Sequence, residues 1–255
     1  MDNKISSIQS LDRVISIIEL LSLYPKGVSL TELCSKTQLP KGTVSRMLSS
    51  LIAHGYVLQN IENKHYCLTM RLFEVGCRVV GGANILSIAR PYLENLSTVT
   101  QDTVHLVSRD NDEVVYLYKE DVTSSIVRMA SCVGSRNPMY CTGVGKSILA
   151  YVPKEEVAAI WNRTEIIQHT PNTITTLERL LDELAEVRRT GFAIDDVEHE
   201  IGVRCIAAPI LDFHNVPIAA ISISAHSDSL TDEKIREYSP LLIETAKNIS
   251  RYYGA

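Results

Sequence analysis

Residues 29–55 read SLTELCSKTQLPKGTVSRMLSSLIAHG, and this stretch decides the fold of the N-terminal part of the chain. Ser29, with Glu32 three residues later, forms a capping box, which predicts a short helix that runs to about residue 36. Pro40 suits the first turn of a second helix, because that position needs no backbone N–H. Gly55 is expected to end this second helix. The stretch therefore predicts two helices joined by a three-residue turn, as in a helix-turn-helix.

The second of these helices has one apolar face, and its polar face carries hydroxyls and cations but no acid. Such a face suits the major groove of DNA, because a carboxylate would be repelled by the phosphates. A solvated face of an ordinary helical hairpin would carry similar residues, but the local positive charge favours DNA. Base contacts are expected from the N-terminal half of the helix, at Lys41, Thr43, Ser45 and Arg46. The other candidate DNA contacts are Ser29, Thr31, Gly42, Ser49, Ser50 and Lys64.

The flanking segments complete a winged helix-turn-helix over residues 6–68. A first helix is predicted over residues 6–23, with Ser6 and Gln9 as a capping box. Its expected apolar stripe is Leu11, Val14, Ile15, Ile18 and Leu21. The β-prone runs 56–59 and 65–68 flank a polar turn and predict a hairpin that carries Lys64 near its tip.

A linker over residues 69–83 is predicted to contain a helix at 70–80. Its apolar residues, which we expect at a dimer contact, are Leu72, Phe73, Val75, Val79 and Val80. Residues 84–255 then form a larger domain in which strands and helices mix without strict alternation, which predicts an α+β fold. Strands are expected at 103–109, 113–119, 125–130, 205–211 and 217–224. Helices are expected at 84–100, 145–151, 175–190 (capped by Thr175 and Glu178, and ended by Gly191) and 231–253.

Composition places the chain among ordinary globular proteins, since 45% of its 255 residues are hydrophobic and 22% are charged. No stretch approaches the roughly 20 apolar residues that a membrane helix needs. The first ten residues lack the apolar region of a signal peptide, so a cytoplasmic protein that does not contact membranes is expected. The six cysteines are scattered without a C-x-x-C pair, which predicts buried, reduced thiols.

The net charge of −5 is unevenly distributed. Residues 1–82 carry +3 and the remainder carries −8. This asymmetry is typical of a basic DNA-binding module joined to an acidic partner domain.

Several motifs resemble the IclR family of bacterial transcription regulators. SLDRV (10–14), LTEL (30–33), LPKGTVSRML (39–48) and GYV (55–57) are similar to its DNA-binding domain. RNPMYCTGVGKSILA (136–150), GVRCIAAP (202–209) and AAISIS (219–224) resemble its effector-binding domain, which implies a GAF-like (profilin-like) sheet. Through the RNPMY run, the chain resembles the subgroup that represses pectin and 2-keto-3-deoxygluconate catabolism. Gly42 departs from the family, which usually has Ser there, so this position lacks the hydroxyl and offers DNA only its backbone N–H.

The resemblance implies an effector pocket formed by Gly143, Val144, Asp195, Cys205, Ser222 and Ser224. The chemistry of these residues agrees with an acid ligand. Backbone N–H groups of the Gly143–Gly145 run can point at an anion from the start of a helix. Ser222 and Ser224 alternate along a strand and so face the same side. Without the resemblance, a plain turn and a polar sheet face would be the simpler interpretations. Arg128 and Asp196 are further candidates that the resemblance does not support.

These observations predict a homodimeric or homotetrameric repressor that binds a palindromic operator in double-stranded DNA and responds to a small organic acid, such as 2-keto-3-deoxygluconate. No cofactor is expected. The chain lacks a G-x-S-x-G elbow and an H-E-x-x-H pair, which argues against an enzyme. An enzyme or a metal-binding sensor acting on a sugar acid stays as the alternative. His199 lies in sequence near Asp195, Asp196, Glu198 and Glu200, which could bind a metal, but a solvated loop or an ion-paired pocket rim is favoured.

Overall fold

The computed structural model describes residues 8–82, 85–121 and 131–255, and only the backbone of residues 79–82. The chain divides into two compact units, residues 1–82 and residues 83–255, which we call the first and second units. The expected strand at 125–130 and the expected helix start at Ser6 lie outside the described residues.

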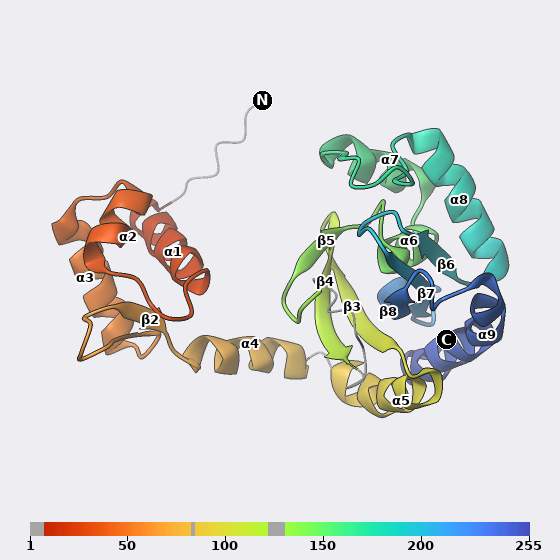
Figure 1. Ribbon diagram of the computed structural model, residues 1–255, viewed down its shortest axis with the longest axis horizontal. Helices are drawn as coiled ribbons and strands as arrows, with labels where there is room; N and C mark the ends of the chain where they lie inside the picture. The colour runs from red at the N-terminus through yellow and green to blue at the C-terminus, as the bar shows by residue number, and fades with distance from the viewer. Residues whose placement is uncertain (1–7, 83–84, 122–130) are drawn as a thin grey trace. The chain divides into compact units, whose positions relative to one another are not determined.

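The first unit is a winged helix-turn-helix, as the sequence predicts (Figure 1). Ile17, Leu33 and Leu48 are fully buried where its first three helices meet. Its two strands pair antiparallel, and the backbones of Val28 and Tyr66 exchange hydrogen bonds that join the wing to the start of α2. The elements are α1 (Gln9–Ser22), α2 (Leu30–Thr37), α3 (Lys41–Ala53), β1 (Val57–Gln59), β2 (Tyr66–Leu68) and α4 (Arg71–Gly82).

The local signals for helix ends are partly confirmed. The Ser29 side chain caps α2 by accepting a hydrogen bond from the Glu32 N–H at 3.2 Å. Gly55 follows α3 with a φ of +76°, the left-handed conformation that ends a helix. Within the described residues, α1 begins at Gln9 with Ile8 as its N-cap and without a side-chain cap, and the capping box expected at Ser6 lies outside them.

The expected apolar stripe of α1 is only partly buried. Of its members, Leu21 enters the core and Val14 and Ile18 are partly buried, whereas 54% of Leu11 and 45% of Ile15 is exposed. Ile17, which the stripe did not include, is fully buried. Within the described part of the first unit, the cores of α2, α3 and the wing cover only one side of α1. The other side therefore keeps an apolar surface.

The second unit is built on a six-stranded antiparallel sheet with the order β5-β4-β3-β8-β7-β6. It confirms the α+β class. Its strands are β3 (Thr103–Asp110), β4 (Glu113–Glu120), β5 (Arg136–Pro138), β6 (Ala193–Asp196), β7 (Val203–Leu211) and β8 (Pro217–His226). Its helices are α5 (Ile85–Thr100), α6 (Gly143–Leu149), α7 (Lys154–Arg163), α8 (Leu177–Thr190), α9 (Asp232–Ser250) and the 3₁₀ turn η1 (Arg251–Tyr253).

Helices cover both faces of this sheet (Figure 1). α5 and α9 pack on the face that carries Ile206, Ile221 and Ile223. α6, α7 and α8 lie over the other face, which carries Ala207 and Ala220. Because side chains alternate along a strand, Ser222 and Ser224 point to the α6 face.

Some boundaries differ from the sequence prediction. α6 begins at Gly143 rather than residue 145, because the Thr142 side chain caps it by accepting from the Gly145 N–H at 3.2 Å. α8 is capped by Thr176 rather than Thr175. The short strands β5 and β6 and the helix α7 were not predicted. β5 has three residues and β6 has four, which is too short for a pattern of alternation to show.

All six cysteines are unpaired, but Cys77 and Cys132 are exposed, so the expectation that every thiol is buried is wrong. Among the described helices, none is both long and apolar enough to cross a membrane.

Replacing Gly145 with Ala should strongly destabilise the second unit. A Cβ at Gly145 would collide with the backbone of Met139 and lie 2.6 Å from Thr142 Oγ1. Overpacking of this kind costs about 1–3 kcal/mol or more. Urea unfolding followed by circular dichroism measures the loss. Gly42→Ala is the matched control, because nothing lies within 4 Å of its Cβ, and it should not destabilise. Equal stability of the two variants would contradict this close approach.

Candidate functional site

The predicted DNA-contacting residues lie on the surface of the first unit. Val44, Met47, Leu48 and Leu51 form the buried side of α3. Helical periodicity places Gly42, Arg46 and Ser49 at the centre of the opposite, exposed side. Around them, Thr31, Lys41, Ser50 and Lys64 are exposed, and Ser29, Thr43 and Ser45 are half-buried. The polar face expected from the sequence is therefore accessible.

Three cations of this surface are available to an anionic partner. Among the residues that the structure describes, Lys41, Arg46 and Lys64 form no ion pair with an acid. Lys64 lies in the turn between β1 and β2 with a φ of +59°, and its carbonyl accepts a hydrogen bond from Gln59 Nε2 at 3.0 Å. The Lys64 backbone is thus fixed within the turn, whereas the Lys64 ammonium stays exposed.

Two hydroxyls of this surface have structural partners. Ser29 caps α2, and the Ser49 hydroxyl donates to the Ser45 carbonyl at 3.0 Å. Gly42 has open space where a side chain would be, so the serine usual in the IclR family would fit there. Packing therefore does not require glycine at position 42, and the glycine removes a possible hydroxyl contact with DNA.

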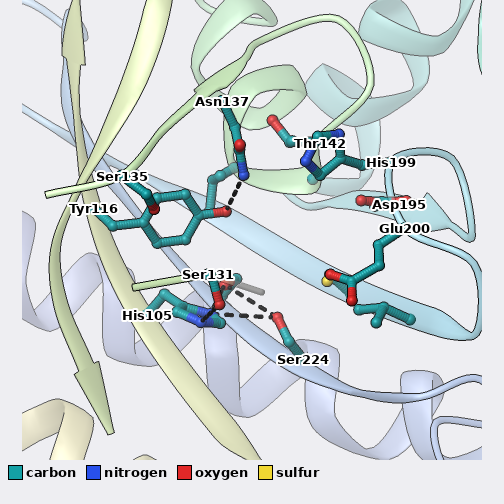
Figure 2. A pocket seen from close by; sticks show the side chains of 15 residues that line it. His105, Tyr116, Ser131, Ser135, Asn137, Thr142, Asp195, His199, Glu200 and Ser224 are labelled. Carbon is teal, nitrogen blue, oxygen red and sulfur yellow. Dashed lines mark hydrogen bonds between the residues drawn. The ribbon is translucent and has the colours of Figure 1, made fainter. Parts of the chain in front are cut away.

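A cavity of about 100 Å³ lies in the second unit on the α6 face of the sheet (Figure 2). This is small beside the roughly 300–1,000 Å³ of most ligand pockets, so it suits a compact ligand. All six residues that the sequence assigned to an effector pocket line it: Gly143, Val144, Asp195, Cys205, Ser222 and Ser224.

Strand register explains why residues far apart in the sequence meet at this cavity. Asp195 of β6 pairs with Cys205 of β7, which in turn pairs with Ser224 of β8. In the same way, His105 of β3 pairs with Ser222. Directly paired residues point to the same face of a sheet, so these side chains form two rows on the cavity floor.

His105 organises the hydroxyl groups of the cavity (Figure 2). Its Nδ1 lies 3.2 Å from Ser222 Oγ and 3.4 Å from Ser224 Oγ, and its Nε2 lies 3.0 Å from Ser131 Oγ. Burial, assisted by the positive charge of Lys119, lowers the pKa of His105 to about 3. His105 is therefore a neutral imidazole near pH 7, and it orients hydroxyls without adding charge.

Two acids line the cavity, Asp195 and Glu200, and Asp195 is only 4% exposed. Its Oδ1 accepts a hydrogen bond from the Glu198 N–H at 2.7 Å. Burial raises the pKa of Asp195 to about 7, with a further upward contribution from the negative charge of Glu198. Near neutral pH this carboxyl can thus either donate or accept a hydrogen bond.

The wall of the cavity is tied together by a buried ion pair. Lys146 of α6 is fully buried and pairs with Glu198, and its Nζ also lies 3.2 Å from Glu183 Oε1 of α8. Gly143 and Val144, three and two residues before Lys146, line the cavity. They occupy the first turn of α6, where backbone N–H groups have no acceptor within the helix. These amides can therefore bind an anion at the cavity wall.

Two of the four acidic residues near His199 form ion pairs, which agrees with the favoured interpretation of a pocket rim. Asp196 is exposed and binds Arg204 at 2.7 Å, and it does not line the cavity, so its assignment as a pocket residue is wrong. Glu198 pairs with Lys146. Arg128 lies outside the described residues.

Sequence reasoning missed much of the cavity lining. His105 stands in a predicted strand between the apolar residues Val104 and Leu106, and that break in the pattern was the available signal. Burial raises the pKa of the Tyr116 hydroxyl, so this group stays protonated near pH 7. The same hydroxyl accepts a hydrogen bond from Asn137 Nδ2 at 3.3 Å. The missed lining residues are His105, Tyr116, Ser131, Ser135, Asn137, Thr142, His199, Glu200 and Val203.

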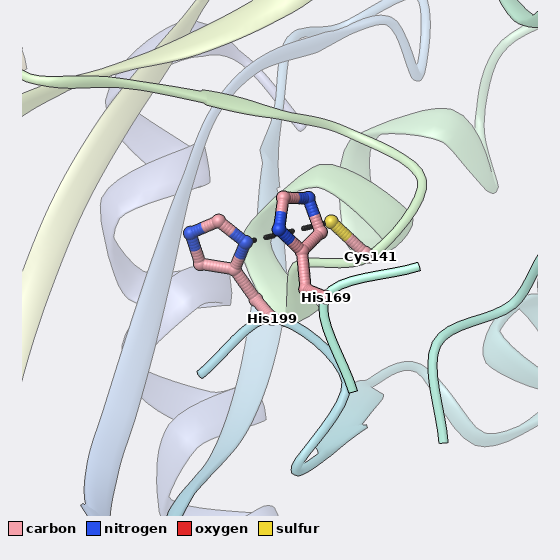
Figure 3. A group of neighbouring side chains, drawn as sticks. All are labelled: Cys141, His169 and His199. Atoms are coloured by element: carbon pink, nitrogen blue, oxygen red, sulfur yellow. Dashed lines mark hydrogen bonds between the residues drawn. The ribbon is translucent and has the colours of Figure 1, made fainter. Parts of the chain in front are cut away.

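One group of side chains beside the cavity has the donor types of a metal site. Cys141, His169 and His199 each place one potential ligand atom within 4.8 Å of the others (Figure 3). Burial raises the pKa of Cys141 to about 12 and lowers the pKa of His199, so both are neutral near pH 7.

Asp195→Asn should stabilise the protein at pH 8 much more than at pH 5. The folded-state pKa of about 7 exceeds the ordinary value of 3.8, so ionisation of Asp195 opposes folding increasingly between about pH 4 and pH 7. The full effect above pH 7 is up to about 4 kcal/mol. Urea unfolding at pH 5 and pH 8 measures it. Asp228→Asn is the control, since the Asp228 side chain is 89% exposed. A difference between wild type and Asp195→Asn that does not change with pH would refute the prediction.

Comparison with known proteins agrees with this architecture. Residues 10–60 match the IclR helix-turn-helix domain, and residues 77–251 match the family described as bacterial transcriptional regulator IclR C-terminal. The HTH-type transcriptional regulator KdgR of Escherichia coli K12 is 36% identical over 254 residues, which cover 100% of this chain and 96% of the relative.

Two further relatives extend the comparison. The DNA-binding transcriptional repressor YiaJ of Escherichia coli K12 is 37% identical over 96% of this chain and 88% of its own length. The crystal structure of the Thermotoga maritima IclR has a TM-score of 0.85 and 35% identity, over 98% of this chain and 100% of that one. The winged helix-turn-helix, the α+β second unit and these matches together show that the chain belongs to the IclR family of bacterial transcriptional regulators.

Proposed function

We propose that this regulator is a repressor that binds a palindromic operator through α3 and the wing, and that a small organic acid in the cavity of the second unit controls it. The cavity carries the proposal, because all six residues expected to bind an effector line it. A repressor agrees with the name of the YiaJ relative. A bacterial repressor of this kind acts in the cytoplasm, where the chromosome lies.

The DNA contacts follow from the exposed face of α3. Arg46 lies at its centre and can reach a base edge, whereas Lys41 and Lys64 can bind phosphates. The second unit carries a net negative charge, so we do not assign DNA contacts to it. We assign DNA binding to residues 6–68, the linker to residues 69–83 and effector binding to residues 84–255.

The proposed ligand is a compact acid with hydroxyl or keto groups, such as 2-keto-3-deoxygluconate. The amides of Gly143 and Val144 would bind its carboxylate. Ser222 and Ser224, oriented by His105, would bind its other oxygens. Asp195 would bind a hydroxyl, and its raised pKa limits repulsion of the ligand's charge.

We propose a homodimer or homotetramer as the active form. A single reading helix recognises a short half-site, and a two-fold dimer doubles the contacts across a palindrome. Leu11 and Ile15 of α1 and Phe73 of α4 are exposed apolar residues that a second copy can cover. The side chains of Val79 and Val80 lie outside the described residues. The acid would favour one conformation of the second unit and thereby change the affinity of the dimer for DNA.

The cavity favours ligand binding over catalysis. His105 touches serine hydroxyls, as a general base would, but its pKa of about 3 makes it a weak base near pH 7. Its described hydrogen-bond partners are all serine hydroxyls, and a hydroxyl does not raise this pKa as a carboxylate would. Turnover of sugar acids by the purified protein tests the alternative of an enzyme.

Arg46→Ala should weaken specific operator binding by about 1–3 kcal/mol, because it removes a base contact. A mobility-shift titration on the DNA upstream of the protein's own gene, at one fixed salt concentration, measures the change. Arg189→Ala is the control, since Arg189 is an exposed arginine on α8, in the other unit. Failure of the wild type to bind any fragment specifically would refute operator binding, and equal losses in both variants would refute the role of Arg46.

Ser222→Ala should leave DNA binding of the ligand-free protein unchanged and blunt its response to acid. Loss of one hydrogen bond to a charged ligand weakens binding about 10-fold or more. The same mobility shift, titrated with 2-keto-3-deoxygluconate and with pyruvate, gives both quantities. Ser229→Ala, an exposed serine of the second unit, is the control. A parallel loss of DNA binding would instead make Ser222 a structural residue.

A further inference from the structure

The second unit has a further cavity, which lies apart from the effector cavity. Its volume of about 480 Å³ falls within the roughly 300–1,000 Å³ of most ligand pockets. Its lining residues come mainly from the last turns of α8 and α9, from η1 and from the end of β7. None of its described lining residues is shared with the effector cavity. We call this cavity the α8–α9 groove.

The α8–α9 groove is basic, although the second unit is acidic. Residues 83–255 carry a net charge of −8. Among the described residues, no aspartate or glutamate lines the groove, whereas four cationic side chains do: Arg188, Arg189, Lys247 and Arg251. A concave surface lined by charges of one sign raises the local concentration of ions of the opposite sign. The groove therefore attracts anions against the net charge of its own unit.

The two arginines of α8 differ in how their charge is balanced. Arg188 donates hydrogen bonds to the carbonyls of Ala150 and Val152, the second at 3.2 Å. These carbonyls are uncharged, so they fix the orientation of the guanidinium without neutralising it. Arg189 instead forms an ion pair with Glu186 on the same helix. Arg188 is thus the oriented, unneutralised cation on the α8 side of the groove.

The two cations on the other side of the groove are also unneutralised. Cations are common near helix C-termini, because they complement the helix dipole and bind free carbonyls. Among the described residues, however, Lys247 forms no hydrogen bond or ion pair, and Arg251 donates to the Asn248 side chain at 2.9 Å rather than to a carbonyl. The carboxylate of Ala255, which also lines the groove, is not ion-paired within the described chain. Both cations are therefore available to a ligand.

The groove suits a phosphorylated molecule better than a simple carboxylate. Guanidinium groups bind phosphate oxygens through paired N–H groups, and three unneutralised cations match a ligand with two or more negative charges. Pro209, Leu211 and Ile243 give the groove an apolar side against which an organic group can pack. Tyr151 and Asn215 add a hydroxyl and an amide that can bind sugar oxygens.

We propose that the α8–α9 groove is a second ligand site, which binds a small phosphorylated metabolite. Arg188 binds the phosphate from the α8 side, and Lys247 and Arg251 bind it from the α9 side. Arg188 is also bonded to the segment that follows α6, and the first residues of α6 line the effector cavity. The two sites are therefore connected through one helix.

Isothermal titration calorimetry of the full-length protein tests the site, with pyrophosphate and fructose bisphosphate as probes at fixed ionic strength. At least one probe should bind saturably, with one molecule per chain. Lys247→Ala and Arg251→Ala should each weaken this binding about 10-fold or more, because each removes a hydrogen bond between charged groups. Citrate, which carries a comparable charge on carboxylates, should bind at least about 10-fold more weakly. Equal binding of citrate would overturn the assignment to phosphate.

Arg236→Ala and Lys154→Ala are the matched controls. Both residues are exposed in the second unit and lie outside the groove, and Arg236 is on α9 itself. They should bind the probe as the wild type does. Lys247 and Arg251 are exposed, so their replacement should not unfold the protein, and circular dichroism checks this. The proposal is wrong if neither probe binds saturably, or if groove and control variants bind equally. Neither DNA nor a keto acid enters this assay, so its outcome is independent of the proposed function.

Discussion

The second unit depends on one buried ion pair, between Lys146 and Glu198. An ammonium group that is fully excluded from water is tolerated only when it is paired, because an unpaired buried charge costs several kcal/mol. The pair therefore holds the start of α6 against the segment after β6. Residues on or next to these two segments line the cavity: Gly143 and Val144 in α6, and Asp195 near the end of β6.

The same constraint explains the chemistry of the cavity. Its polar groups are buried on a sheet whose other face is apolar, so burial dominates their pKa values and favours their neutral forms. His105 is neutral, Tyr116 and Cys205 keep their protons, and Asp195 titrates near neutrality. Burial thus supplies the cavity with neutral hydrogen-bonding groups, beside which the acid Glu200 also lines it.

The groups proposed to bind ligands differ between the two units in charge and in exposure. In the first unit they are exposed cations, carried by a helix that packs on a small apolar core. In the effector cavity of the second unit they are buried and paired, so neighbouring groups determine their pKa values and orientations. A change on α3 is therefore expected to act locally, whereas a change in the cavity alters several hydrogen bonds at once.

The sequence by itself determined the features that depend on short windows. The buried side of α3 follows helical periodicity, Ser29 caps α2, and Ser222 and Ser224 share one face of β8 because side chains alternate. Only the tertiary structure decided which distant residues meet. The antiparallel order β5-β4-β3-β8-β7-β6 sets the register that joins His105 to Ser222. Non-local pairing also brings His199 to Cys141, and no local pattern encodes such contacts, because their energy comes from packing between segments far apart in the chain.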